Sequence, residues 1–187
     1  MTSEGPHGGA PPPPRVHVVR ARPADAERLS AFGRRVFHAA FAAGNDPADL
    51  DTYIASAYTP EAQAGELADA NVTTLLAQDD AGVLLAFAQV RTAAVPACVD
   101  DETAVELWRF YVDQAWHGRG VAAPLMAAAC DEARARGART VWLGVWEHNP
   151  RAKAFYAKCG FTPVGTHVFV FGRDHQTDEI WQKTLTS

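Results

Sequence analysis

The sequence predicts a single α/β domain built around a mixed β-sheet. Apolar, β-branched segments alternate with segments of helical periodicity, in the order β-α-α-β-β-β-α-β-α-β-β. A helix joins the strand expected at 104–113 to the strand expected at 140–146, and such a crossover makes two neighbouring strands parallel. The 187 residues, of which 48% are hydrophobic, are enough to bury one sizeable core.

The folded domain is expected to begin after residue 14. Residues 1–14 hold five prolines and three glycines, a composition that forms no packed core and favours a disordered or extended tail. The domain then spans 15–187 and opens with an alternating strand at 16–22. Pro23 and Asp25 start a helix that runs to about residue 43. Apolar residues at intervals of three and four predict the core face of this helix: Leu29, Phe32, Val36, Phe37 and Phe41.

The middle of the chain predicts a second helical region and a hairpin. Residues 47–70 have a less regular helical pattern that is broken near Thr59 and Pro60. Two strands are expected at 73–78 and 83–91, and the turn sequence DDAG joins them. The strand at 104–113 follows a loop.

The last third of the chain alternates again between helices and strands. Helices are expected at 121–136, ending at Gly137, and at 150–159, ending at Gly160, with the strand at 140–146 between them. The final two strands are expected at 161–172 and 178–185, joined by GRDHQTD. Asp174, His175 and Asp178 resemble metal ligands, but a segment so rich in turn-forming residues predicts a turn, and no metal site is expected.

Charge and cysteine content narrow the classes of function. The net charge of -5 and the pI near 5.8 supply no basic field for a phosphate backbone, so we expect no nucleic-acid partner, and an amine substrate fits better. Cys98, Cys130 and Cys159 lie far apart and indicate neither a disulfide framework nor a zinc site. Without an apolar leader or a membrane-spanning stretch, a cytoplasmic protein with no membrane partner is expected.

The segment YVDQAWHGRGVAAPLM, residues 111–126, is built to hold an anion. A strand ends, Gly118 and Gly120 flank Arg119, and a helix begins at once. A helix start exposes unpaired N–H groups at the positive end of the helix dipole, and together these bind a pyrophosphate. Glycines let the anion approach the backbone, and the arginine adds charge at the rim.

Two related phosphate-binding motifs are excluded. The phosphate loop GxxxxGK[ST] is absent, and Ala123 stands where the GxGxxG fingerprint needs its third glycine. A nucleotide triphosphatase or a dinucleotide-binding dehydrogenase is therefore not expected. Taken alone, the Gly-Arg-Gly segment is equally consistent with a simple tight turn.

A second motif follows in WEHNPRAKAFYAKCGF, residues 146–161. Asn149 suits the N-cap and Pro150 the first position of a short helix. Helical spacing places Asn149, Lys153 and Tyr156 along one stripe. A tyrosine is a competent proton donor beside a developing anion, although capping for Asn149 and core packing for Tyr156 are alternatives that spacing leaves open.

The two motifs together closely resemble the acetyl-CoA site of the GNAT superfamily of N-acetyltransferases, whose pyrophosphate loop has the pattern (Gln/Arg)xxGx(Gly/Ala). The segments LGVWEHNPRAKAFY and FGRDHQTDEIWQKTL are similar to the PaiA-type spermidine/spermine acetyltransferase branch. Alignment of Gly120 and Ala122 with the loop puts His117 where the family has Gln or Arg, which would make a side-chain contact with the cofactor pH-dependent. The resemblance implies a central mixed, mostly antiparallel sheet, splayed at its fourth and fifth strands and flanked by about four helices.

The resemblance also implies a reaction: direct attack of a primary amine on acetyl-CoA in a ternary complex, with no metal. Glu106 is the candidate base, Tyr156 matches the family's acid, and a backbone N–H near Val112 would bind the oxyanion. The residues expected at the cofactor are Phe110, Tyr111, Val112, His117, Gly118, Arg119, Gly120, Val121, Ala122, Asn149 and Lys153.

The identity of the acceptor stays open at this point. A polyamine-like small amine is expected first, and the acidic residues of 46–51 and 61–69 either receive its distant ammonium groups or form solvated helix faces. A protein N-terminus or lysine is the alternative acceptor. A non-catalytic acyl-CoA-binding sensor is the alternative of another class. Similar proteins are often dimers, so a homodimer is a further expectation.

Overall fold

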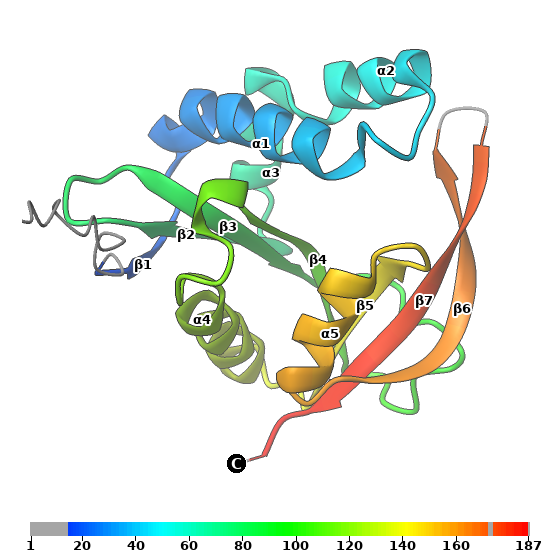
Figure 1. The fold of residues 1–187 in the computed structure, drawn as a ribbon. Helices are drawn as coiled ribbons and strands as arrows, with labels where there is room; N and C mark the ends of the chain where they lie inside the picture. Colours follow the sequence, from blue (N-terminus) through cyan, green and yellow to red (C-terminus); the bar gives the residue numbers. More distant parts are fainter. Residues whose placement is uncertain (1–14, 172–173, 187) are drawn as a thin grey trace, which may run out of the picture.

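The computed structural model describes residues 15–171 and 174–186, which form one seven-stranded sheet with helices on both faces (Figure 1). The strand order is β1-β2-β3-β4-β5-β7-β6. The strands are β1 His17–Arg20, β2 Val72–Gln78, β3 Leu84–Arg91, β4 Val105–Val112, β5 Thr140–Trp146, β6 Thr162–Phe171 and β7 Asp174–Thr184. The helices are α1 Ala26–Phe41, α2 Pro47–Ala57, α3 Pro60–Ala68, α4 Ala122–Ala135 and α5 Pro150–Lys158. The predicted α/β class and mixed sheet are confirmed, whereas the predicted tail at 1–14 lies outside the described residues.

The fourth and fifth strands separate soon after they meet. In the described chain β4 and β5 pair in parallel at only two positions, Val105 with Val141 and Glu106 with Trp142, while the other strand pairs are antiparallel. Strand β4 also carries a bulge, because Leu107 pairs with Val90 and Arg109 with Gln89. The predicted splay is confirmed, and it leaves one edge of β4 without a strand partner beyond residue 106.

Two separate apolar clusters hold helices to the two faces of the sheet. On one face, α1 and α2 bury Leu29, Phe32, Val36, Phe37, Leu50 and Ile54 against Leu76 and Phe87. On the other face, α4 and α5 bury a second cluster that includes Leu125, Met126, Ala129, Ala133 and Tyr156. Figure 1 shows α1, α2 and α3 above the sheet and α4 and α5 below it. Four of the five apolar residues predicted for the core face of α1 are buried, and Phe41 is half-buried.

The break predicted near Thr59 and Pro60 divides the second helical region into α2 and α3. The Thr59 side chain accepts a hydrogen bond from the Ala62 N–H at 3.0 Å, and Pro60 occupies the first helical position. Asp46 caps α2 in the same way through the Ala48 N–H at 2.8 Å. Two successive N-caps therefore turn one helical region into two short helices.

The connection between the last two strands differs from the prediction. Strand β7 begins at Asp174, so Asp174, His175 and Asp178 are strand residues that pair with β6 rather than residues of a turn. Residues 172 and 173 lie outside the described residues. Antiparallel pairing satisfies the backbone whatever the side chains are, and a run of polar residues with turn propensity concealed this strand. The resulting β6–β7 ribbon extends beyond β5 toward the connection between α1 and α2 (Figure 1).

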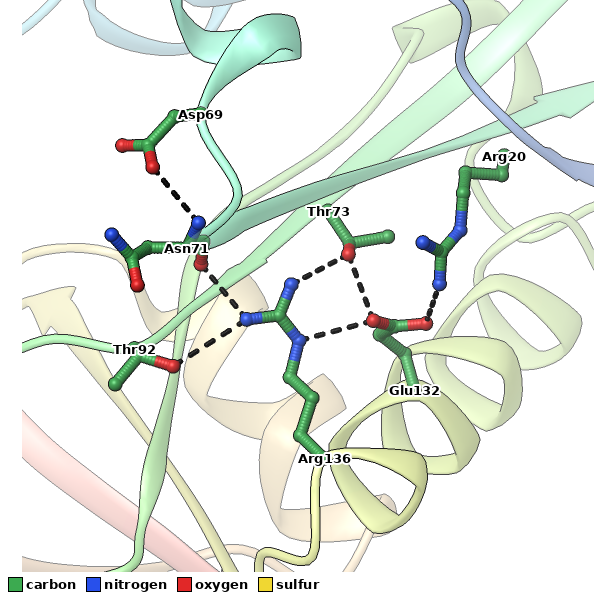
Figure 2. Close-up of polar contacts among 7 residues, drawn as sticks. All are labelled: Arg20, Asp69, Asn71, Thr73, Thr92, Glu132 and Arg136. Atoms are coloured by element: carbon green, nitrogen blue, oxygen red, sulfur yellow. Dashed lines mark hydrogen bonds and ion pairs between the residues drawn. The ribbon is translucent and has the colours of Figure 1, made fainter.

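Helix α4 is clamped to the edge of the sheet by one carboxylate. Glu132 accepts hydrogen bonds from Thr73 at 2.8 Å, Arg136 at 3.0 Å and Arg20 at 2.5 Å. Figure 2 shows the Arg136 guanidinium reaching on to Thr73, the Asn71 carbonyl and Thr92. These bonds tie the C-terminal end of α4 to β1 and β2.

Candidate active site

One cavity of about 570 Å³ runs along the gap between β4 and β5 and opens onto the face of the sheet that α1 covers. Its lining comes from β4, the segment before α4, the ends of β5 and α5, and the β6–β7 ribbon. The predicted site residues in the lining are Glu106, Phe110, Tyr111, Val112, His117, Gly118, Gly120, Val121, Ala122, Asn149 and Tyr156. The structure thus brings together Glu106 and Tyr156, which are 50 positions apart in the sequence, in the lining of one cavity.

The segment before α4 has the backbone geometry of an anion cradle. Gly118 has φ +73° and Gly120 has φ +81°, which a residue with a side chain adopts only with strain. A Cβ at either position would meet no atom within 4 Å, so conformation rather than crowding requires the two glycines. The unpaired N–H groups of the first turn of α4 lie immediately after them, at the positive end of the helix dipole.

His117 lies between this segment and α5. Its Nε2 is 3.0 Å from the Val112 carbonyl oxygen, which only accepts, and its Nδ1 is 2.8 Å from Arg151 Nη1, which only donates. These partners are both satisfied by a neutral ring that carries its proton on Nε2. His117 therefore holds the Arg151 guanidinium at the wall of the cavity, beside the glycines.

The open edge of β4 offers backbone groups to the gap. The Asp113 N–H donates to the Leu85 carbonyl of β3 at 2.9 Å, and Tyr111 pairs with Phe87 in the same register. The N–H and C=O groups of successive residues in a strand point alternately to its two sides. Tyr111 therefore directs its backbone groups toward β3, while Phe110 and Val112 direct theirs toward the gap. Of these three residues expected at the cofactor, Phe110 and Val112 therefore direct backbone groups into the gap, whereas Tyr111 contributes its ring to the cavity lining.

Helix α5 places Tyr156 at the gap on the sheet face that α4 and α5 cover, opposite the face that α1 covers. The Asn149 side chain accepts from the Ala152 N–H at 3.1 Å and caps the helix. Tyr156 is 8% exposed and packs in edge contact with Phe110 and Phe161. Burial raises the pKa of the Tyr156 hydroxyl above its ordinary value, so the group stays protonated at neutral pH.

Two residues predicted at the cofactor lie outside the described lining of the cavity. Lys153 donates to the Glu147 carbonyl and to Glu179, both at 2.8 Å. The Arg119 guanidinium stacks over the Trp116 ring, 5.5 Å from its centroid, at the rim. Neither belongs to the described cavity lining.

The floor of the cavity carries two acid–base pairs on the same sheet face. Glu106 is buried, and its Oε2 accepts from Arg91 Nε at 2.5 Å. Asp178 Oδ2 on β7 lies 3.7 Å from His167 Nε2 on β6. Sequence reasoning found Glu106 but missed Asp178, His167 and Arg151. Arg151 and Asp178 lie inside segments that the sequence analysis quoted, but strand register and helix packing, rather than local spacing, bring all three residues to the cavity.

Aromatic side chains form the remaining wall on this face. We call this group the aromatic lobe: Phe37, Phe41, Tyr53, Tyr111, Trp146 and Phe169. The ring centroids of Phe41 and Trp146 are 6.2 Å apart, and those of Tyr53 and Phe169 of the ribbon are 6.3 Å apart. All but Phe37 are only half-buried, so part of each of these side chains is exposed.

The described residues contain neither a membrane-spanning helix nor a cluster of metal-binding side chains. Residues 15–171 and 174–186 contain no helix that is long and apolar enough to cross a membrane. In the same part of the chain, His, Cys, Asp and Glu side chains form no group of three or more that could hold a metal ion.

A splayed sheet with a glycine cradle at the start of the crossover helix defines the GNAT class of acyltransferases. The model of the acetyltransferase (GNAT) family matches residues 38–161, so the chain belongs to that family and is an N-acetyltransferase.

The chain is also similar to individual proteins. It is 29% identical over 170 residues to an uncharacterised N-acetyltransferase of Lactobacillus delbrueckii subsp. lactis, covering 91% of this chain and 98% of that protein. It is 32% identical over 161 residues to an uncharacterised N-acetyltransferase of Mycobacterium tuberculosis, covering 86% and 98%. The crystal structure of the PaiA N-acetyltransferase from Thermoplasma acidophilum in complex with coenzyme A has the same fold, with a TM-score of 0.76 and 20% identity over 91% of this chain and 99% of that chain.

Proposed function

We propose that the protein transfers the acetyl group of acetyl-CoA to the primary amine of a small molecule, by direct attack in a ternary complex. The continuity of one cavity carries this proposal. The cavity joins the glycine cradle, the open edge of β4 and the Tyr156 hydroxyl to a sheet face with carboxylates and aromatic rings. A donor and an acceptor can therefore occupy it together, with their reacting atoms at the gap.

The donor half of the cavity suits acetyl-CoA. The backbone around Gly118 and Gly120 would bind the pyrophosphate, with Arg151 and Arg119 adding positive charge. The gap-facing backbone of Phe110 would bind a pantetheine amide, while the Val112 carbonyl already accepts from His117. Coenzyme A in the similar PaiA structure supports the choice of donor. Lys153, engaged by Glu147 and Glu179, is assigned to supporting the fold of α5.

The chemistry needs a proton donor, an oxyanion site and a proton acceptor. Tyr156 would protonate the departing thiolate of CoA, because burial keeps its hydroxyl protonated until a negative charge develops nearby. The Val112 N–H would bind the oxyanion of the tetrahedral intermediate. Glu106, predicted as the base, faces the cavity, where its Oε2 already accepts a hydrogen bond from Arg91 Nε at 2.5 Å.

The cysteines support direct attack over an acetyl-enzyme route. Burial raises the pKa of the Cys130 and Cys159 thiols, an effect that Lys183 opposes in both. A protonated thiol is a poor nucleophile. The described lining of the cavity includes no cysteine.

The aromatic lobe supports a small amine with a hydrocarbon body. Aromatic faces attract ammonium groups and pack against methylene chains, which suits the polyamine-like acceptor that we propose first. Of the acidic segments 46–51 and 61–69, no residue belongs to the described lining, so the rings and the two floor pairs would have to recognise the acceptor. A cytoplasmic location and a homodimer stay predictions from the sequence.

The test is release of free CoA thiol from acetyl-CoA by the purified full chain. The acceptor panel contains spermidine, spermine, simple diamines, 2-phenylethylamine, amino acids, aminoglycosides and short peptides. We expect thiol release that depends on a small amine, with the acetylated amine identified by mass spectrometry. Preference for peptides would replace the small-molecule proposal. Acetyl-CoA binding without turnover of any acceptor would favour a non-catalytic sensor.

A further inference from the structure

A glycine on β5 creates an open seat beside the gap between the strands. Gly144 lies two residues beyond Trp142, the last β5 residue paired with β4, and it belongs to the cavity lining. It is exposed although both neighbours on the strand are buried. Its side chain would point to the sheet face that also carries Glu106, so the missing side chain leaves space where a thioester in the gap can be reached from that face.

Two titratable groups border this seat. A Cβ built on Gly144 would lie 3.2 Å from His167 Nε2 and 3.3 Å from Asp178 Oδ2. His167 pairs directly with Asp178 across the β6–β7 ribbon, and Asp178 lies opposite Trp146 on β5. The sheet register therefore brings a carboxylate and an imidazole together over Gly144, at the wall of the cavity.

The surroundings of Asp178 favour proton uptake. Burial raises the pKa of this carboxyl, the nearby His167 opposes the rise, and Glu147 at the end of β5 adds to it. The Asp178 side chain is 16% exposed, whereas that of His167 is 43% exposed and can exchange protons with solvent. Across the seat, the Glu106 carboxylate accepts a hydrogen bond from Arg91 Nε at 2.5 Å.

We propose that the amine nitrogen of the acceptor binds over Gly144 and that Asp178, positioned by His167, accepts its proton before the attack on acetyl-CoA. This inference rests on the proposed function and assigns to Asp178 the role of base that the sequence predicts for Glu106. Glu106 and Arg91 would form the opposite side of the seat and orient the acceptor.

The proposed step balances in atoms and charge. The ammonium loses one proton to Asp178, from which it passes through His167 to solvent, and the freed lone pair forms a C–N bond with the thioester carbonyl carbon. The C–S bond then breaks, and Tyr156 protonates the CoA thiolate. The second proton lost by the nitrogen restores Tyr156. The products are the N-acetyl amine, CoA and one released proton.

The first test is the pH dependence of kcat/KM for spermidine and for 2-phenylethylamine. We expect Asp178→Asn to lower this value at neutral pH by about 100-fold or more, in the range typical of a lost general base. The loss should shrink as the pH approaches the pKa of the free amine, because the substrate then arrives deprotonated. Glu106→Gln should retain the pH profile of the wild type with a higher KM for the amine.

A second comparison separates chemistry from folding. We expect 2,2,2-trifluoroethylamine, which is largely unprotonated at neutral pH, to react with Asp178→Asn at a rate within a few-fold of the wild type. His167→Gln should shift the acidic limb of the pH profile, while His175→Gln, on an exposed residue of the same ribbon, should leave it unchanged. Gly144→Ala should abolish amine turnover but preserve the Kd for acetyl-CoA, because the added methyl group would lie 3.2 Å from His167 Nε2 and 3.3 Å from Asp178 Oδ2 and would displace both side chains.

The outcomes distinguish this inference from the proposed function. A wild type that acetylates amines, together with an Asp178→Asn variant of near-normal rate and unchanged pH profile, would overturn only the assignment of Asp178. If Glu106→Gln instead loses the acidic limb of the pH profile, the assignment of Asp178 is also overturned, and Glu106 is the base. A wild type without amine-dependent CoA release would overturn both.

Discussion

Tyr156 combines two properties that a proton donor needs. Its hydroxyl belongs to the cavity lining, and its ring is fixed between Phe110 and Phe161. Burial raises its pKa, so the proton is retained at neutral pH until a thiolate forms beside it. The packing that makes Tyr156 a core residue also fixes its position at the gap, so core packing is compatible with the proposed role as acid, although burial makes the hydroxyl a weaker acid.

Removal of the Tyr156 hydroxyl should affect turnover and not folding. We expect Tyr156→Phe to lower kcat by about 100-fold, a typical contribution of general acid catalysis, with the Kd for acetyl-CoA unchanged. A phenyl thioester donor should restore most of the rate, since its thiolate leaves without protonation. Steady-state kinetics with both donors measure this. An equal loss with both donors would show that the hydroxyl does not act as the acid.

The sequence predicted site residues that lie in local motifs and missed those that depend on register. Gly118, Gly120, Asn149 and Tyr156 occupy short segments whose composition is tied to a turn or a helix end. Asp178 reaches the cavity only because β7 pairs with both β5 and β6, and a sequence pattern does not fix such pairings.

At the scale of elements, the start of α5 serves both the fold and the cavity. Asn149 caps the helix through the Ala152 N–H, and the same residue lines the cavity. The order Asn-Pro at the N-cap and first position predicted this helix correctly, because the chemistry of a helix end is local. The prediction shortened the polar strand β7, because its pairing with β5 and β6, and not its own composition, makes this segment a strand.

Two substitutions of Asn149 separate the cap from a contact with the cofactor. Asn149→Ala should lower the free energy of unfolding by about 1 kcal/mol, a typical value for a lost N-cap. Asn149→Asp keeps the capping oxygen, so its stability should match the wild type. If the Asn149 amide N–H also binds pantetheine, both variants raise the KM for acetyl-CoA. Thermal unfolding and kinetics check the two effects, and a normal KM in both would limit Asn149 to capping.

At the scale of the whole molecule, the splay of β4 and β5 is the feature on which the proposed function depends. The sequence predicted the order of the elements, the parallel crossover and, through family resemblance, the splay. It could not predict the extent of the β6–β7 ribbon, which closes the cavity from the far edge of the sheet. Long-range packing sets this feature, since Tyr53 on α2 and Phe169 on β6 are far apart in sequence.

The clamp between α4 and the sheet should make the fold sensitive to acid (Figure 2). Burial raises the pKa of Glu132, but hydrogen bonds from Thr73 and Arg136 and the charge of Arg20 outweigh it, so the folded-state pKa lies below the ordinary value of 4.5. The stabilisation is therefore complete above the unfolded-state pKa and is lost as the pH falls through the folded-state pKa.

A neutral side chain at position 132 should remove this dependence. We expect Glu132→Gln to lower the free energy of unfolding by about 1–3 kcal/mol at pH 7, the typical cost of disrupting a largely buried, charge-assisted bond, and by much less near pH 3. Asp131→Asn, at an exposed neighbour, is the matched control. Urea unfolding at the two pH values measures both. A deficit that is equal at both pH values would contradict the assigned role of the charge.

The most direct test of acetyl transfer within one ternary complex is a single-turnover experiment with labelled acetyl-CoA. The enzyme, in excess over [acetyl-¹⁴C]-CoA, is mixed with spermidine or 2-phenylethylamine and quenched at successive times. We predict that free CoA and labelled amide appear together at one rate and that the protein carries no label, with or without amine. Label that accumulates on the protein, or CoA released at the same rate without amine, would contradict the account.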